Sequence, residues 1–572
     1  MTILQWFIFF LVIQIIHYLG TWKLYEKAGR KSWEAAIPVY NAIILMKIIN
    51  RPTWWTALLF VPVINVFMFI VVWVETARSF GKNTTKDTLL VIFTLGFYIY
   101  YLNYVENVVY KRDRSLVAAT KAGDTISSLL FAIIVATLVH TYVIQPFNIP
   151  TSSLEKSLLV GDFLFVSKFH YGAKTPKTAV AIPMVHDSIP FVRLSDSIPF
   201  LNGRSYLRHP QYPSFRLPGL QEIKRNDIVV FNWPVDTVYK FRDKSGKHVY
   251  KPVDKKSNYV KRCVGIPGDN LSVKDGDVYI NNKKLILPTR AKLQYLHKVY
   301  AKNGVPLEEI KKTGSTEYQR SFVVFLSDDS QRNAVSPYVR DFYKNKDGSI
   351  TVKTDEKGIP LEIIKASNIS ITEVYDTVNL ANLTFEGAKT LRNSSDIDSV
   401  IKLNIPKQKN KEIFPHNTNW TVDNYGPIYI PHAGKTLALT KENLSLYKRI
   451  IKEYEGNTLV EKGGQILIND KPTTSYTFKQ DYYWMMGDNR QTSEDSRYWG
   501  FVPFDHVVGK PVFIWWSIDQ NIPWSQAIDK VRWERLFCTV GGDGEPKSYF
   551  VYFLIALVGW FGFDFYRKKK KA

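Results

Sequence analysis

The chain has 572 residues, too many for one small domain, and a formal net charge of +23. Its mean hydropathy of −0.14 averages intensely apolar ends with a polar middle. A basic balance is typical of proteins that bind nucleic acid or an anionic membrane surface. Apolar segments stand at both ends of the chain, so the sequence predicts that its partner is a lipid bilayer. No RNP-like, zinc-finger or helix-turn-helix pattern occurs, so binding to nucleic acid is not predicted.

The first part of the chain, residues 1–124, is predicted to be a membrane region with about three spans. Ile3 to Leu19 is about long enough to cross a bilayer. It lacks the basic leading end and the small-residue cleavage site of a signal peptide, so we interpret it as an anchor. Residues 35–49 are apolar but short, which suits the membrane interface. Trp54 to Val74 and Thr88 to Tyr104 are expected to be further spans.

Two more apolar segments flank the polar part of the chain. Residues 125–145 are predicted to form a transmembrane anchor, and residues 548–572 a C-terminal transmembrane helix with a basic tail, Lys568 to Lys571. Basic side chains also follow the first apolar run and precede residue 125. Because basic loops tend to remain in the cytoplasm, residues 146–547 are expected on the outer face of the membrane.

The outer part is predicted to be rich in β-strands. Asp227 to Phe231 and Tyr259 to Val264 are short apolar runs bounded by turn residues, which is the pattern of buried strands. Residues 287–424 are rich in Lys, Asn, Ser and Thr and contain no cluster suited to catalysis, so we interpret them as an inserted subdomain. The expected fold is a mostly β domain with an inserted subdomain, anchored by several transmembrane α-helices.

Several kinds of site find no support in the sequence. The ten histidines are scattered, without a His-Glu-x-x-His motif or paired cysteines, so neither a metal nor a cofactor is predicted. No Gly-x-Ser-x-Gly elbow occurs, and His140, at the outer end of a predicted span, needs no special role. Cys263 and Cys538 lie far apart and are interpreted as free thiols, although one bridge would be possible in an oxidising compartment.

Three polar segments contain side chains suited to catalysis, and each also has a plain structural interpretation. The segment 147–158 contains Ser153 and has the composition of a polar turn. Lys261 stands in an apolar strand, where burial would lower its pKa and let it act as a base; the alternative is an exposed lysine. The segment 487–500 mixes both charges, as a structural ion-pair loop would.

Taken together, the three segments resemble the signature boxes of bacterial type I signal peptidases. The most specific match is GDNRQTSEDSRYWGFVP, residues 487–503. The resemblance implies that Ser153 is the nucleophile and Lys261 the general base. It also implies that the Thr151 hydroxyl helps the backbone amide of Ser153 to hold the oxyanion. The implied fold is a β-rich catalytic core with an appended second β domain.

The resemblance extends to supporting residues and has three departures. It implies that Ser493 orients the lysine and that Asp495 and Arg497 form a supporting ion pair. The departures are Ser152 where the family commonly has Gly, Leu154 where it has Met, and Lys156 where it has Pro. All the hydroxyls and the amine that the chemistry requires are nevertheless present.

The resemblance also implies substrates and a location. The substrates would be pre-proteins bearing signal peptides, with small residues at the first and third positions before the cut. The location would be the bacterial cytoplasmic membrane, with the dyad at its outer face. The residues expected to line the substrate pockets, for which ordinary core packing is the alternative, are Phe147, Ile149, Leu154, Leu158 and Val260. The alternative functions are an inactive membrane scaffold of the same fold and, with less support, a transporter.

Overall fold

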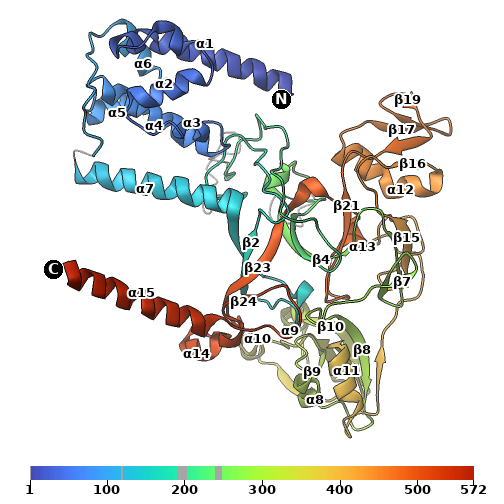
Figure 1. The fold of residues 1–572 in the computed structure, drawn as a ribbon. Helices are drawn as coiled ribbons and strands as arrows, with labels where there is room; N and C mark the ends of the chain where they lie inside the picture. The colour runs from blue at the N-terminus through green and yellow to red at the C-terminus, as the bar shows by residue number, and fades with distance from the viewer. Residues whose placement is uncertain (1, 118–119, 190–191, 193–201, 239–247, 572) are drawn as a thin grey trace.

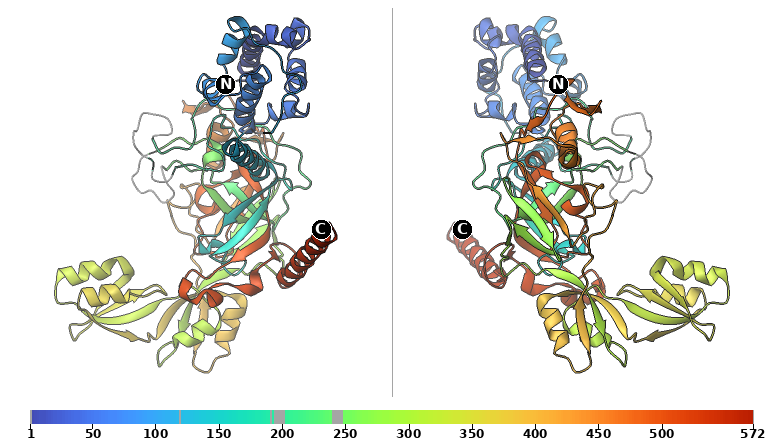
Figure 2. Two further views of the ribbon diagram at one scale, coloured as in Figure 1. Left: turned by 90° about the vertical axis from the view of Figure 1, so that its left-hand side faces the viewer. Right: turned by 90° about the vertical axis from the view of Figure 1, so that its right-hand side faces the viewer.

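The computed structural model describes the chain except for residues 1, 118–119, 190–191, 193–201, 239–247 and 572. A bundle of helices lies at one end of the molecule, a large β domain in the middle, and a third body at the other end (Figures 1 and 2). The fold is mostly β and carries long apolar helices, so the predicted fold class is confirmed.

The N-terminal bundle packs short helices around the first long one. Its helices are α1 (Ile3–Lys27), α2 (Tyr40–Ile48), α3 (Trp55–Leu58), α4 (Ile64–Ser79), α5 (Thr85–Phe93) and α6 (Tyr98–Tyr104). They share one apolar core, to which α1, α2, α4, α5 and α6 all contribute buried side chains. The bundle touches the β domain through the Trp6 ring, which stacks on Tyr212 at a centroid distance of 4.6 Å.

The two segments expected to be spans, 54–74 and 88–104, are not continuous helices in the structure, and whether they cross the membrane stays a prediction. The first breaks between α3 and α4, where Val63 has a φ of +71°. The second breaks between α5 and α6, where Gly96 has a φ of +86° and no room for a Cβ against the Trp73 ring, 2.6 Å away. In the described part of the chain, three helices are long and apolar enough to cross a membrane: Ile3–Lys27, Lys121–Val143 and Phe550–Lys570.

These three long helices project to the same side of the β domain (Figure 1). They are α1, the segment that joins α7 (Lys121–Leu138) to a π-helical turn at Val139–Val143, and α15 (Phe550–Lys571). The end of α1, the start of α7 and the end of α15 lie away from the β domain. Each of these ends carries lysines, so the basic ends gather on one side.

The β domain is built on an eight-stranded sheet that curls into a half-barrel. Its order is β1-β2-β23-β3-β4-β21-β22, and β24 pairs with β23. The strands are β1 (Ile144–Asn148), β2 (Asp162–Ser167), β3 (Ile228–Asn232), β4 (Asn258–Gly265), β21 (Tyr482–Met486), β22 (Val502–Pro503), β23 (Val507–Ser517) and β24 (Cys538–Thr539). Neighbouring strands of this sheet run antiparallel. The helical segment that begins with α7 leads into the edge strand β1.

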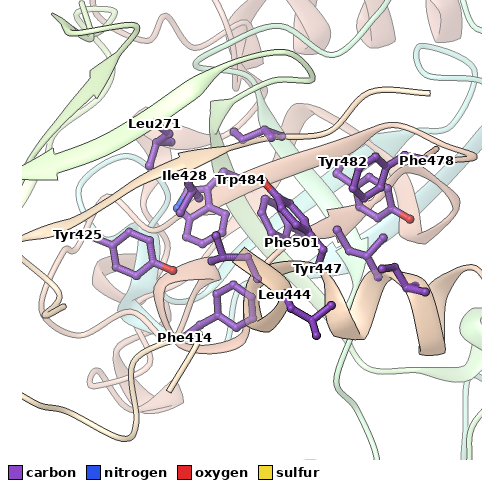
Figure 3. Packing of buried hydrophobic residues seen from close by; sticks show 14 of the residues in the cluster. Leu271, Phe414, Tyr425, Ile428, Leu444, Tyr447, Phe478, Tyr482, Trp484 and Phe501 are labelled. Atoms are coloured by element: carbon purple, nitrogen blue, oxygen red, sulfur yellow. The ribbon is translucent and has the colours of Figure 1, made fainter. Parts of the chain in front are cut away.

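A second group of strands packs beside the half-barrel on an aromatic core. It contains β5 (Asn270–Lys274), β6 (Asp277–Ile280), β7 (Lys283–Lys284), β15 (Tyr425–Tyr429), β16 (Thr436–Ala438), β17 (Leu459–Lys462), β18 (Gln465–Ile468), β19 (Lys471–Pro472), β20 (Ser475–Thr477) and α12 (Lys441–Arg449). Trp484 of β21 lies at the centre of the core, edge-on to Phe501 at 5.3 Å (Figure 3). This packing fixes β21, and with it the segment that follows β21.

Between β7 and β15 the chain forms two small sheets at the end of the molecule opposite the helical bundle (Figure 2). One consists of β8 (Gln294–Tyr300), β13 (Val378–Thr384) and β14 (Ser399–Lys402), with α8 (Leu307–Lys312) and α11 (Phe385–Arg392). The other consists of β9 (Arg320–Phe325), β10 (Val339–Lys344), β11 (Ile350–Thr354) and β12 (Ser370–Val374), with α9 (Asp329–Val335) and α10 (Leu361–Ala366). Each has its own apolar core. We refer to residues 287–424 as the inserted subdomain.

Candidate active site

Ser153 lies in a short turn directly after β1. Ile149 still bonds to β2, donating to the Asp162 carbonyl at 2.9 Å, and Thr151 is extended. The chain then turns through a single 3-10 turn, Ser152–Leu154, which stops the strand and buries Ser153. The nucleophile predicted from the sequence therefore stands where β1 ends.

Lys261 reaches Ser153 from the middle of β4. Its Nζ donates a hydrogen bond to Ser153 Oγ at 2.6 Å, and only 4% of the lysine is exposed. Burial disfavours the charged ammonium and lowers the pKa of Lys261 to about 8, although the nearby Asp495 and Glu494 carboxylates oppose this shift. About a tenth of this lysine is therefore neutral at pH 7, and the neutral form that a general base requires increases as the pH rises.

The segment after β21 passes close to the Ser153 turn, and a glycine makes this approach possible. A Cβ on Gly487 would lie 2.2 Å from Ser493 Oγ and 2.5 Å from the Ser153 carbonyl oxygen. Ser493 is buried beside this turn, and its hydroxyl has no hydrogen-bond partner among the described residues. The structure therefore brings Ser493 to the site without a bond between its hydroxyl and Lys261.

Asp495 and Arg497 form the ion pair that the sequence suggested. The Asp495 carboxylate accepts two hydrogen bonds from the Arg497 guanidinium, both at 2.8 Å, and both side chains are fully buried. Asp495 also accepts from the Gly487 amide at 3.0 Å. The pair thus holds the backbone beside Ser153, and the Asp495 charge raises the pKa of Lys261.

The remaining predicted residues also lie near the dyad. The expected pocket residues share one apolar cluster, in which three are buried and two are half-buried; the cluster contains Ile149, Leu154 and Leu158, with Phe147 and Val260 packed against it. Thr151 is half-buried, and in the described part of the chain its hydroxyl has no hydrogen-bond partner. The same five residues belong to the core of the half-barrel, so their contact with a substrate stays a prediction.

A second buried ion pair was missed by the sequence reasoning. Arg262 binds the Asp488 carboxylate through two bonds, of 2.7 and 2.6 Å, and Ser157 donates to the same carboxylate at 2.5 Å. Arg262 keeps the pKa of Asp488 below its usual value. The pair ties β4 to the segment after β21 and to the Ser153 turn. The available signal was the opposite charges of these two residues, each of which adjoins a motif residue.

The cysteines and histidines that the sequence analysis considered do not form part of the dyad. Cys263 on β4 and Cys538 on β24 are buried free thiols. Among the described residues, no three His, Cys, Asp or Glu side chains are grouped so as to hold a metal ion. His140 lies in the π-helical turn at the end of α7.

Comparison with known proteins shows the family to which the chain belongs. The profile of the family described as signal peptidase, peptidase S26, matches residues 122–332 and 430–516, which is about half of the chain. Residues 33–113 match a family of unknown function, DUF5684.

Three curated relatives are each named signal peptidase I. The protein from Rickettsia conorii is 30% identical over 158 residues, 28% of this chain and 42% of the relative. The protein from Rickettsia typhi is 28% identical over 170 residues, 29% of this chain and 47% of the relative. The protein from Buchnera aphidicola is 23% identical over 407 residues, 71% of this chain and 80% of the relative. The chain thus matches less than half the length of the two Rickettsia relatives, but most of the Buchnera protein. The chain belongs to the signal peptidase family, peptidase S26.

Proposed function

We propose that the protein is a membrane-anchored endopeptidase that removes signal peptides from exported pre-proteins with a Ser153–Lys261 dyad. The observation that carries the proposal is the 2.6 Å hydrogen bond between Lys261 Nζ and Ser153 Oγ in a buried site. A lysine that is desolvated and faces a hydroxyl suits a base that activates a nucleophile. Membership of the signal peptidase family supplies the reaction class.

The reaction proceeds through an acyl-enzyme. Neutral Lys261 takes the proton from Ser153 Oγ, which attacks the scissile carbonyl carbon. The resulting ammonium gives the proton to the leaving nitrogen, which frees the mature protein as an amine and leaves the signal peptide esterified to Ser153. A water molecule, deprotonated by Lys261, then attacks the ester, and the proton returns to Ser153 as the signal peptide leaves as a carboxylic acid.

Two donors would hold the oxyanion of the tetrahedral intermediates. One is the backbone amide of Ser153, and the other is the hydroxyl of Thr151, which lies two residues earlier in an extended conformation. Ser493, which lies beside Gly487, would orient the lysine. The Asp495–Arg497 pair supports the segment on which Ser493 stands.

The strand edges around the dyad suit an extended peptide. Among the described strands, β1 lies at the edge of its sheet and pairs only with β2. Residues 258–261 of β4 pair with β3, whereas the pairing of β4 with β21 begins only at Arg262. An extended substrate segment could therefore bond to free backbone groups on both sides of the dyad, as in strand addition. Small substrate side chains would then face the cluster that contains Ile149 and Leu154.

The arrangement of the long helices suits a catalytic domain on the outer face of the bacterial cytoplasmic membrane. The lysine-bearing ends of α1, α7 and α15 point away from the β domain (Figure 1), and basic ends tend to stay in the cytoplasm. This orientation does not depend on the two spans expected at 54–74 and 88–104, because together they would cross the membrane out and back. Ser153 lies in the turn after β1, and β1 begins directly after the π-helical turn at the end of α7, so the nucleophile lies close to where a membrane-embedded signal peptide would emerge.

The test is cleavage of a pre-protein by the purified, detergent-solubilised protein. We expect a shortened product whose mass and new N-terminus place the cut after a small residue, and no product with Ser153→Ala. A wild-type protein that is folded but leaves several pre-proteins intact would contradict the proposal and favour an inactive scaffold. Chelators should not reduce the cleavage.

A further inference from the structure

The inserted subdomain is bonded to the turn that carries Ser153. Four hydrogen bonds join the two: Ser152 Oγ donates to Glu317, Gln294 donates to the Glu155 carbonyl, Lys156 Nζ donates to the Gly314 carbonyl, and Ser157 Oγ donates to the Arg290 carbonyl. The residues on both sides of Ser153 and Leu154 are thus held by a subdomain that lies outside the half-barrel. The nucleophile turn does not rest on the sheet alone.

Glu317 is the centre of these contacts, because its carboxylate joins three segments of the chain. One oxygen accepts from Ser152 Oγ. The other accepts from Asn382 Nδ2 at 2.8 Å, from Asn489 Nδ2 at 2.9 Å and from Thr492 Oγ1 at 2.9 Å. Hydrogen bonds to an ionised acceptor are roughly twice as strong as neutral ones. Glu317 therefore links the inserted subdomain, the Ser153 turn and the segment after β21.

Asn489 extends the link to the backbone of the nucleophile. Its Nδ2 also donates to the Ser152 carbonyl at 3.2 Å, and its backbone amide donates to the Ser153 carbonyl at 3.1 Å. Asn489 is fully buried. The side chain and carbonyl of Ser152 and the carbonyl of Ser153 are thus fixed by one network, which sets the direction in which Ser153 Oγ points.

The effect of Glu317 on the dyad is geometric. The charged groups with the largest influence on the pKa of Lys261 are Asp495, Glu494, Arg497 and Asp488. The Glu317 carboxylate contacts the residue before the nucleophile and does not contact Lys261 Nζ or Ser153 Oγ. Loss of Glu317 should therefore misdirect the hydroxyl without changing the pH at which Lys261 becomes neutral.

We propose that Glu317 of the inserted subdomain is a positioning residue that holds Ser152 and thereby aims Ser153 Oγ at Lys261 and the scissile carbonyl. This inference rests on the proposed peptidase function. It gives the inserted subdomain a part in catalysis, since it supplies a group that completes the nucleophile turn.

The test compares Glu317→Ala, Glu317→Gln, Ser152→Ala and the double variant Glu317→Ala/Ser152→Ala. A displacement of about 1 Å costs up to about 100-fold in rate, so we expect Glu317→Ala to lower kcat by about 10- to 100-fold with little change in KM. Glu317→Gln can turn its amide oxygen toward the three donors and should restore most of kcat. The double variant should be little worse than Glu317→Ala, because coupled residues are not additive.

A matched control separates positioning from general stability. Glu373→Ala removes the same charge from the inserted subdomain, where Glu373 binds Arg320 away from the Ser153 turn. It should leave kcat unchanged. The apparent pKa of the pH–activity profile should be the same in wild type and Glu317→Ala.

A second measurement does not depend on activity. The amides of Glu155 and Leu158 are hydrogen-bonded within the turn, at 2.9 and 2.8 Å. By hydrogen exchange with mass spectrometry, Glu317→Ala should exchange faster over residues 152–158, and Glu373→Ala should not. Unchanged exchange and unchanged kcat in Glu317→Ala would overturn the inference. If wild type does not cleave pre-proteins, the proposed function fails, whereas exchange still decides whether Glu317 holds the turn.

Discussion

Two regions of this molecule bury charge, and they do so in opposite ways. In the N-terminal bundle, Glu75 of α4 accepts hydrogen bonds from Arg51 at 2.9 Å and from Arg114 at 2.5 Å. In the β domain, Lys261 is equally buried, but its ammonium nitrogen bonds to the hydroxyl of Ser153. A buried charge with its counter-ion is a structural feature, whereas a buried amine that faces a hydroxyl has a lowered pKa and can take a proton.

The β domain contains both arrangements side by side. Asp495 and Arg497 are paired as completely as Glu75 and its arginines, yet they lie directly behind the dyad. A buried charged residue near the dyad is therefore not reactive by its position alone. The paired residues hold the backbone, whereas among the described residues the amine of Lys261 bonds to a hydroxyl and not to a carboxylate.

Removal of either member of the dyad should have the largest effect. Ser153→Ala removes the nucleophile and Lys261→Ala removes the base, so each should abolish cleavage in a protein that still folds and inserts. Glu75→Gln, the matched change in the paired cluster, should cleave at the wild-type rate. The measurement is the rate of product formation from a purified pre-protein. Substantial turnover by either dyad variant would contradict the distinction between the reactive Lys261 and the paired charges.

Thr151 should show the next largest effect. Removing one oxyanion donor from an enzyme costs about 10²–10³ in kcat, and the contact strengthens in the transition state, so KM should change little. The kcat of Thr151→Ala and that of Thr151→Val should both fall by that factor. Thr151→Ser keeps the hydroxyl and should remain near wild type. If the Val and Ser variants are equally active, Thr151 is a turn residue only.

Substitutions in the buried ion pairs should lower the stability of the fold more than the rate of cleavage. Asp495→Asn leaves Arg497 buried without its counter-ion, which costs about 3–5 kcal/mol. It also removes a negative charge near Lys261, so the pKa of the lysine should fall and the pH–activity midpoint should move down. Glu75→Gln should destabilise the helical bundle and leave that midpoint unchanged. The checks are urea unfolding and a pH series, and a midpoint that moves equally in both variants would contradict the distinction.

The resemblance and the hydropathy pattern differ in what they predict about this chain. Ser153 and Lys261 lie in motifs whose order identifies a family, so residues 108 positions apart could be paired by resemblance. The hydropathy pattern predicted spans at 54–74 and 88–104 but not the breaks in their helices, because hydropathy does not report backbone conformation. The breaks at Val63 and Gly96 are set by positive φ values inside apolar stretches.

The contacts that support the site could not be predicted from the sequence, for a different reason. Arg262 and Asp488 lie in separate motifs, and Glu317 lies in a region without any motif. Their contacts depend on how the inserted subdomain and the segment after β21 fold back onto the Ser153 turn. Apart from the opposite charges of Arg262 and Asp488, local sequence carries no signal for such long-range contacts.

The most direct test of the central claim is the pH dependence of kcat, with Lys174→Gln as control. Burial also lowers the pKa of Lys174, to about 7, but among the described residues its amine has no hydrogen-bond partner, whereas the amine of Lys261 bonds to Ser153. A base must be neutral to accept a proton, so activity should be low where Lys261 is an ammonium. It should rise with pH through a midpoint near 8 and then level off. The control should have the same midpoint. A midpoint near 7 that shifts in Lys174→Gln, or activity that does not rise with pH, would contradict Lys261 as the base.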